Sequence, residues 1–192
     1  NTRIVEKLEI FPPMYLLETL PITNNVSSLV YGTRNQISSI LHGKDDRVLV
    51  VCGPCSIHDP ESAREYARKL KEQQDSLSKN LLIVMRVYFE KPRTTVGWKG
   101  LINDPDLNES YDVNKGIHLA RSLLLEFGNM GLPCGTEFLD LISPQYVADL
   151  ISWGAIGART AESQTHRELA SGISCPIGIK NGTNGALKPA ID

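Results

Sequence analysis

The chain lacks three features that would narrow its function at once: a long apolar segment, an excess of one charge and a large number of cysteines. No run approaches the ~18 consecutive apolar residues of a membrane-spanning helix, so we expect no membrane partner. Twenty Lys and Arg stand against 22 Asp and Glu, a formal charge of −2, which argues against non-specific nucleic-acid binding. The first residues also lack the apolar core of a signal peptide, and we expect a cytoplasmic protein.

The few cysteines are expected to be reduced thiols, because Cys134 and Cys175 lie in or beside apolar runs. Cys52 and Cys55 have the C-x-x-C spacing of thioredoxin-like redox motifs. Such a motif needs a helix that begins at its first cysteine, whereas the nearest helix signal here is Asp59-Pro60. Thiol redox chemistry is therefore only the third-ranked function, and a zinc site made by the pair alone lacks a partner motif.

The amino-terminal part differs in pattern from the rest, and we expect residues 1–46 to form an extension with a role in assembly or regulation. Three prolines between residues 9 and 24 favour an extended arm there, since proline lacks an amide hydrogen and restricts the residue before it. Apolar residues at helical spacing then predict a helix from Val26 to Leu41.

From residue 47 onward, short apolar runs alternate with helix-like segments. The expected strands are 48–52, 81–85, 132–139, 155–158 and 175–179, and the helices between and after them begin near residues 59, 113, 143, 162 and 186. The first run is continuously apolar, as in a strand buried on both faces. Repeated strand–helix units imply a parallel sheet, either an open doubly wound sheet or a closed barrel. A barrel needs about eight units, and only about four to five are legible here.

Reactive side chains follow all five expected strands: Cys55, Arg86, Glu137, Arg159 and Lys180. Barrel active sites are built at the carboxyl ends of strands, so these groups are expected to converge on one mouth. Each one alone would read as a solvated strand end. Cations brought together repel by ~1 kcal/mol at about 4 Å even in water, so the cluster indicates an anionic ligand such as phosphate or carboxylate.

The loop after the second expected strand contains Glu90-Lys91-Pro92-Arg93-Thr94-Thr95. Two cations flank a proline and two hydroxyls follow, which favours a stiff loop suited to a second phosphate. A solvated basic turn is the alternative interpretation of this segment.

Four segments of the chain carry further motifs: GPCSIHD at 53–59, EKPRTTVGWKGLINDP at 90–105, GAIGAR at 154–159 and HRELASG at 166–172. Together they closely resemble 3-deoxy-D-arabino-heptulosonate 7-phosphate (DAHP) synthases, of the class I branch that aromatic amino acids regulate. The resemblance covers essentially the whole chain, and the long loop motif is highly specific. It implies an α/β fold, the (β/α)₈ TIM barrel, with residues 47–192 as its first four to five units.

The resemblance implies a transferase that condenses phosphoenolpyruvate with erythrose 4-phosphate, giving DAHP and phosphate in the first step of the shikimate pathway. It implies one divalent metal (Mn, Fe, Co or Zn), with Cys55 as a thiolate ligand. The residues that it assigns to phosphoenolpyruvate are Arg86, Lys91, Arg159 and Lys180, and those assigned to the aldose phosphate are Arg93 and Thr94. Glu137 would order polar groups or water, and Lys91, Glu137 and Lys180 would be catalytic.

The resemblance also implies feedback inhibition by an aromatic amino acid and assembly into a homodimer or homotetramer. Parts of the effector pocket would be Ser143, Pro144, Gln145 and Ser174. The family's remaining metal ligands, a histidine, a glutamate and an aspartate, lie on later strands and are absent from this chain. A non-catalytic half barrel that acts as a binding or assembly partner is therefore the second-ranked function, although its unpaired strands would expose sheet edges.

Overall fold

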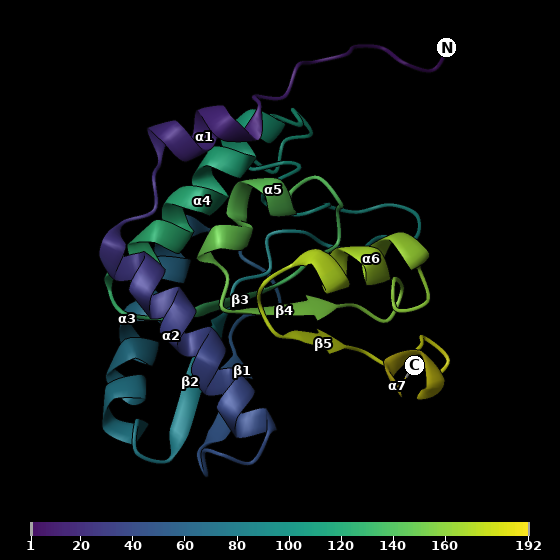
Figure 1. The fold of residues 1–192 in the computed structure, drawn as a ribbon. Coiled ribbons are helices and arrows are strands. Elements are labelled where there is room, and N and C mark those ends of the chain that lie inside the picture. The colour runs from purple at the N-terminus through teal and green to yellow at the C-terminus, as the bar shows by residue number, and fades with distance from the viewer. Residues whose placement is uncertain (1, 192) are drawn as a thin grey trace.

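The computed structural model describes residues 2–191. Residue 1 of the predicted extension (1–46) and residue 192 of the predicted barrel segment (47–192) lie outside the described residues. One parallel sheet runs through the molecule in the order β1-β2-β3-β4-β5 (Figure 1). Its strands are β1 (Val48–Cys52), β2 (Leu81–Arg86), β3 (Cys134–Glu137), β4 (Trp153–Ile156) and β5 (Ile177–Ile179). Because neighbours in the sheet are also neighbours in the chain, the predicted strand–helix repeat is confirmed.

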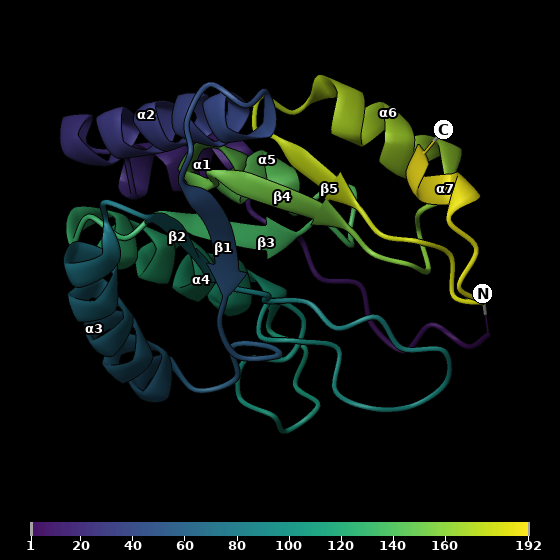
Figure 2. The same cartoon turned by 90° about the horizontal axis from the view of Figure 1, so that it is seen from below.

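Helices precede the sheet and connect its strands. They are α1 (Pro13–Thr19), α2 (Asn24–Leu41), α3 (Pro60–Leu77), α4 (Val113–Asn129), α5 (Pro144–Val147), the 3₁₀ turn η1 (Ala148–Leu150), α6 (Gln164–Gly172) and α7 (Lys188–Ile191). Figure 2 shows α2 on one side of the sheet and α3 and α4 on the other. Within residues 2–191, no helix is long and apolar enough to cross a membrane.

One face of the sheet presents the charged residues at the carboxyl ends of the strands. Helix α2 packs against this face near the amino ends of the strands. Ile37 of α2 is fully buried there, in a cluster with Leu82 and Val84. Trp153 lies across this face, since a Cβ added at Gly135 or Gly178 would come within 3.1 Å or 2.7 Å of its indole. Side chains alternate along a strand, so the face that bears residues 82 and 84 next presents residue 86 at the carboxyl end of β2.

The arm predicted between residues 9 and 24 is partly wrong, because α1 forms inside it. Pro13 occupies the first position of α1, where a helix needs no amide hydrogen from it. The extended segment before α1 is tied down instead by hydrogen bonds. Asn114 of α4 accepts from the amide of Phe11 at 2.9 Å, and Tyr146 of α5 donates to the carbonyl of Phe11 at 2.6 Å.

The strand positions also differ in detail from those predicted. β4 begins two residues earlier than the predicted 155–158, because the ladder with β3 starts at Trp153. β3 and β5 are shorter than their apolar runs. β1 is not buried on both faces, because Val48 is 59% exposed and the other residues of the strand are only partly buried. An apolar run indicates which residues are buried. The bounds of a strand, however, depend on which residues hydrogen-bond to the neighbouring strand.

Candidate functional site

The ends of β1 and β2 meet at Cys55. Lys91 Nζ donates to Cys55 Sγ at 2.9 Å, and Arg86 Nη2 donates to the Cys55 carbonyl oxygen at 3.0 Å. Gly53 allows this approach, because a Cβ there would come within 2.6 Å of the Arg86 carbonyl oxygen. The loop after β1 and the loop after β2 therefore form one corner of the site.

Tyr88 lies near both Arg86, at the end of β2, and Lys180, which follows β5 at the other edge of the sheet. The Arg86 guanidinium lies 3.8 Å above the Tyr88 ring, and Lys180 Nζ lies 5.9 Å from the same ring. Arg86 Nε is buried without a hydrogen-bond partner among the described residues. A buried donor without a partner is costly, and the guanidinium as a whole is suited to an anionic ligand.

The ends of β3, β4 and β5 also come together. A Cβ at Gly157 would come within 2.0 Å of Glu137 Oε1, so glycine at this position leaves room for the Glu137 carboxylate beside the end of β4. Lys180 follows β5 directly, and its amide donates to the carbonyl of Ile156 at 3.0 Å. Glu137 also contributes to the electrostatic environment of Tyr88, as Arg86 does. These contacts place Glu137 and Lys180 on the same mouth as Arg86.

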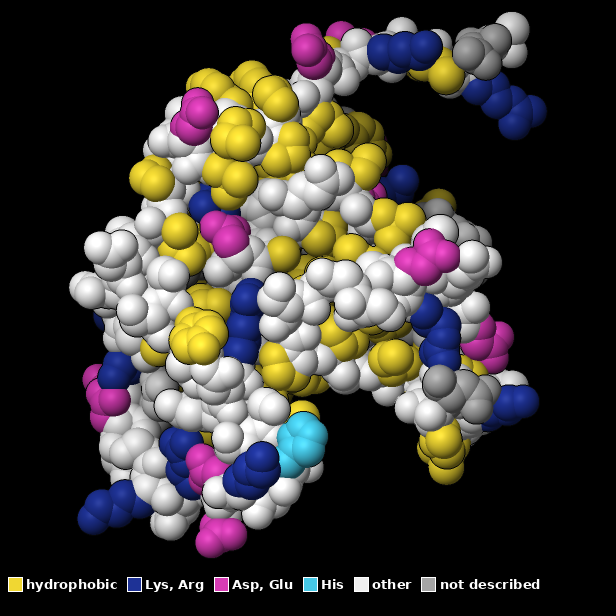
Figure 3. Space-filling view, viewed as in Figure 1, with side chains coloured by type: hydrophobic (Ala, Val, Ile, Leu, Met, Phe, Trp, Pro, Cys, Tyr) yellow, Lys and Arg dark blue, Asp and Glu magenta, His cyan; other side chains and the backbone are white. Residues whose placement is uncertain are grey.

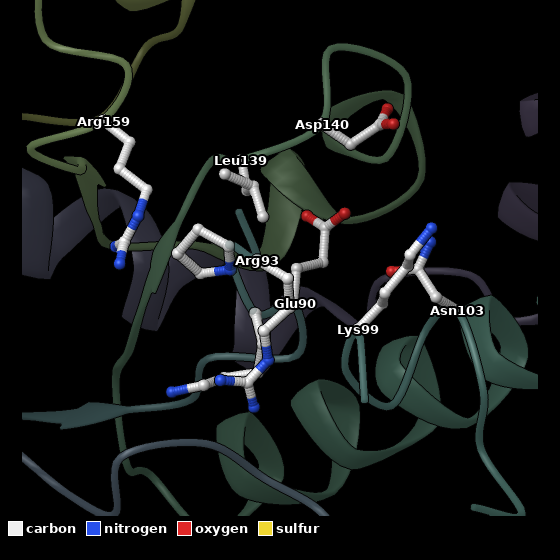
Figure 4. Close-up of a pocket in the computed structure, with 9 residues that line it drawn as sticks. Glu90, Arg93, Lys99, Asn103, Leu139, Asp140 and Arg159 are labelled. Carbon is white, nitrogen blue, oxygen red and sulfur yellow. The ribbon is translucent and has the colours of Figure 1, made fainter. Parts of the chain in front are cut away.

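A pocket of about 350 Å³ opens beside this corner (Figure 4). Its lining residues are Glu90, Lys91, Pro92, Arg93, Lys99, Asn103, Leu139, Asp140 and Arg159. Four cations, three of them in the loop after β2 and the fourth after β4, therefore surround one cavity with only two carboxylates. Such an excess of positive charge suits a phosphorylated or carboxylated ligand.

Cys55 is exposed and surrounded by cations. The hydrogen bond from Lys91 and its charge, followed by the charges of Arg86 and Arg93, lower the pKa of the Cys55 thiol from its ordinary value. The thiolate is the form that reacts and binds metals. No three His, Cys, Asp or Glu side chains in the described part of the chain come together to hold a metal ion. The chemistry of Cys55 thus fits a metal ligand.

Glu90 is a buried carboxyl beside the cations, only 7% exposed. Ser143 Oγ donates to Glu90 Oε2 at 2.9 Å, so the start of α5 is joined to the residue before Lys91. Burial raises the pKa of Glu90 to about 7, and the nearby charges of Asp140 and Glu137 act in the same direction.

The structure brings most of the predicted site residues together. Cys55, Arg86, Lys91, Arg93, Glu137, Arg159 and Lys180 all take part in the contacts or the pocket described above. Thr94 is exposed and does not line that pocket. Ser143 and Pro144 are buried, whereas Gln145 and Ser174 are exposed, and the role of these four in effector binding stays a prediction.

The contributors that were not predicted include Tyr88, Glu90, Lys99 and Asp140. Asp140 follows β3 closely, so the rule that found Arg159 after β4 would also have found it. Glu90 lies inside the loop motif, but its hydrogen-bond partner Ser143 is 53 residues away in the chain. Tyr88 continues the apolar run of β2, and no sequence signal separates it from a core residue.

The C-x-x-C pair does not have a redox geometry. Cys52 belongs to β1 and contributes to the core shared with α3, whereas Cys55 faces the cations. The helix that follows begins at Pro60, so neither thiol caps it. All four cysteines are free thiols.

The chain matches known proteins along nearly its whole length. The model of the DAHP synthetase I family matches residues 20–192. The chain is 61% identical over 192 residues to the Escherichia coli protein named phospho-2-dehydro-3-deoxyheptonate aldolase, Phe-sensitive, covering all of this chain and 55% of that protein. It is 57% identical to the Tyr-sensitive protein of the same organism, covering 54% of it. The chain therefore spans about half the length of these curated relatives.

A solved structure shares the fold. The phospho-2-dehydro-3-deoxyheptonate aldolase of Francisella tularensis superposes with a TM-score of 0.96 at 59% identity, covering 99% of this chain and 56% of that chain. With five parallel strands in sequential order, the predicted partial (β/α)₈ barrel is confirmed.

Proposed function

The chain belongs to the DAHP synthetase I family, and on that premise we propose that it forms about half of an enzyme that condenses phosphoenolpyruvate with erythrose 4-phosphate. The products are DAHP and phosphate, so the enzyme is a transferase of the first step of the shikimate pathway. The observation that carries the proposal is the convergence of five cations at the carboxyl ends of parallel strands: Arg86, Lys91, Arg93, Arg159 and Lys180.

Phosphoenolpyruvate brings a phosphate and a carboxylate, and the cluster offers cations for both. We assign Arg86, Lys91, Arg159 and Lys180 to this substrate. Arg86 is oriented by the Tyr88 ring and the Cys55 carbonyl oxygen, so its guanidinium is positioned before an anion binds. Cations fixed in advance stabilise the negative charge on the phosphate that leaves.

The aldose phosphate is assigned to Arg93 and Thr94. The Nε of Arg93 donates to the Trp98 carbonyl oxygen at 2.9 Å, which fixes the side chain and leaves its two terminal nitrogens for a phosphate. Arg93 lines the pocket with Arg159, so the two substrates would lie in neighbouring parts of one cavity.

One divalent metal is proposed, with Cys55 as its ligand from this chain. When bound, the metal would act as a Lewis acid on the aldehyde of the aldose. Lys91 holds the Cys55 thiol in its ligating form through their hydrogen bond. We assign catalytic roles to Lys91, Glu137 and Lys180, with Glu137 ordering water or polar groups at the end of β3.

The finer features of the family are proposed with the activity. Residues 1–46 would form an extension used in assembly or regulation, and residues 47–192 the first part of the barrel. An aromatic amino acid would inhibit the enzyme through the region of Ser143, Pro144, Gln145 and Ser174. A homodimer or homotetramer and a cytoplasmic location complete the proposal.

The decisive experiment measures loss of phosphoenolpyruvate in the presence of erythrose 4-phosphate. It compares this chain with a version extended by the remaining half of its relatives, with and without a chelator. We expect activity in the extended version only, and its loss on chelation. In that version Arg159→Ala should raise KM for phosphoenolpyruvate, whereas Arg68→Ala, an exposed position on α3, should leave it unchanged. Equal behaviour of the two variants would remove the assignment.

A further inference from the structure

Tyr88 is an aromatic residue among the cations of the proposed site, and the proposed chemistry gives it no role. The central guanidinium carbon of Arg86 lies 3.8 Å from the centre of its ring, and Lys180 Nζ lies 5.9 Å from the same centre. A cation within about 6 Å of a ring centre is attracted to the π electrons. One ring therefore attracts a cation at the end of β2 and another that follows β5.

The backbone around Tyr88 is fixed by hydrogen bonds to two neighbouring parts of the sheet. The Val87 amide donates to the Gly135 carbonyl at 2.8 Å, which extends the pairing of β2 with β3. The Tyr88 carbonyl accepts from the Ile57 amide at 2.9 Å, which joins it to the loop after β1. Tyr88 is only 4% exposed, so its ring is packed on most sides. The ring is therefore in place before a ligand arrives.

An aromatic ring can orient a cation without neutralising its charge. Arg121, which is fully buried, pairs instead with the carboxylate of Asp149 through two hydrogen bonds of 2.7 Å and 2.9 Å. Arg86 and Lys180 form no ion pair within residues 2–191. Burial raises the pKa of Tyr88 above its ordinary value, so its hydroxyl stays neutral and adds no charge. Both cations therefore keep their charge for an anionic ligand.

We propose that Tyr88 is a positioning residue for phosphoenolpyruvate, because its ring orients Arg86 and Lys180 before this anion binds. The role rests on the proposed function, which assigns these two cations to that substrate. Cations that are already oriented lose less conformational freedom on binding and therefore bind an anion more tightly. Without the ring, the Cys55 carbonyl oxygen would be the one partner left to the Arg86 side chain within the described residues.

The first measurement tests the contact itself, by NMR of the Arg86 side chain in this chain without substrates. Protons held above an aromatic ring are shifted upfield by its ring current. We expect Tyr88→Leu to remove this shift and Tyr88→Phe to keep it, because phenylalanine keeps the ring. Arg86 resonances that do not move in Tyr88→Leu would show that the ring does not hold the guanidinium, and would overturn the proposal.

The second measurement is steady-state kinetics in the extended version of the chain. Tyr88→Leu should raise KM for phosphoenolpyruvate roughly tenfold, since the loss of a largely desolvated cation–π contact corresponds to about this factor. KM for erythrose 4-phosphate should not change, and Tyr88→Phe should restore the low KM for phosphoenolpyruvate. A merely structural role would reduce the amount of folded enzyme, and with it the apparent kcat, without raising one KM alone.

Phe89→Leu is the matched control, because Phe89 is a similarly buried aromatic neighbour that packs in the core. It should keep the KM of the unchanged enzyme for phosphoenolpyruvate. If Tyr88→Leu does not fold, Tyr88→Met replaces it, since methionine fills more of the space without a ring.

The outcomes separate this role from the proposed function. An active enzyme whose KM for phosphoenolpyruvate is unchanged by Tyr88→Leu, or by Tyr88→Met in its place, would overturn the role of Tyr88 and leave the function standing. A KM raised equally by Tyr88→Phe would transfer the role to the hydroxyl, and would also overturn the proposal. An unchanged extended version that is inactive would remove the proposed function, and the role of Tyr88 with it.

Discussion

Single residues in this chain are tuned by neighbours that are distant in sequence. Cys55 is shifted toward its thiolate by Lys91, whereas burial raises the pKa of Cys134 and Cys175. Three chemically identical thiols therefore differ in reactivity because of where the fold places them.

The first test at this scale removes the cation beside Cys55. Lys91→Met should raise the Cys55 pKa toward its ordinary value and slow its alkylation by iodoacetamide at neutral pH, because less thiolate is present. The rate is followed across pH by mass spectrometry of the Cys55 peptide. Lys99→Met, which removes a cation from the same pocket without touching Cys55, is the control. A pH profile that does not move would contradict the assigned contact.

The second test concerns Glu90. Its folded pKa of about 7 lies above its usual 4.5, so the folded state favours the protonated form. This contribution to stability is complete below pH 4.5 and is lost as pH rises through 7. Glu90→Gln avoids the loss, so its free energy of unfolding relative to the unchanged chain should rise between pH 4.5 and 7, by on the order of 3 kcal/mol at most. Urea unfolding at several pH values measures it.

Glu168→Gln serves as the control for this test, because Glu168 is exposed on α6. Its stability should follow that of the unchanged chain at every pH. If Glu90→Gln also follows it, Glu90 is not buried as described.

The sequence predicted the reactive residues better than their partners. Cys55, Arg86 and Lys180 could be identified because each follows an apolar run, and a parallel sheet brings such positions to one edge. The Glu90–Ser143 contact could not, because it joins a loop to the start of a short helix on another unit. The stacking of Arg86 on Tyr88 could not be predicted either, because an apolar run does not show at which residue the backbone leaves the strand.

Among the elements, two helices contain glycines with very different surroundings. A Cβ at Gly116 would come within 2.2 Å of the Ile102 carbonyl oxygen, so this glycine lets α4 pack directly against the backbone of the long loop. Gly32, inside α2, has nothing within 4 Å of its Cβ position.

This pair of helical glycines gives opposite expectations for the same substitution. Gly32→Ala should stabilise the chain by roughly 0.5–1 kcal/mol, because alanine restricts the unfolded backbone and favours the helix. Gly116→Ala should destabilise it by about 1–3 kcal/mol, because the added methyl forces α4 away from a backbone that cannot yield. Chemical denaturation compares the two, and equal signs would refute the packing described for α4.

Element types were predictable, but some boundaries were not. The apolar periodicity of α2 and the Asp59-Pro60 start of α3 are local signals, and both helices form close to where they were expected. α1 was missed because Pro12 and Pro13 were taken to favour extended chain, although proline also suits the first turn of a helix. The start of β4 depends on its register with β3, which local sequence does not contain.

For the molecule as a whole, the main feature that promotes association is the pair of unpaired edges on the two outer strands of the sheet. β1 pairs only with β2 and β5 only with β4, so each presents one edge without a strand beside it in the described part of the chain. Figure 3 shows apolar side chains exposed around the hollow side of the molecule. Open edges of this kind promote association between chains.

The isolated chain should therefore self-associate as its concentration rises, and a charge on the β1 edge should reduce this. Val48→Lys is expected to shift sedimentation toward the monomer, because Val48 begins β1 and is exposed. Leu77→Lys, at the exposed end of α3, adds the same charge away from the edge and should change little. Association unaffected by either variant would show that the edges are not its cause.

The unbroken order of the sheet also has a meaning for how the protein is made. Each strand from β2 to β5 pairs with the strand that is synthesised just before it. The sheet can therefore form during translation, before the later strands have been made. Trp153 is translated before Gly178, the residue over which its ring comes to rest, and thus provides a ready platform for the fifth strand as that strand emerges.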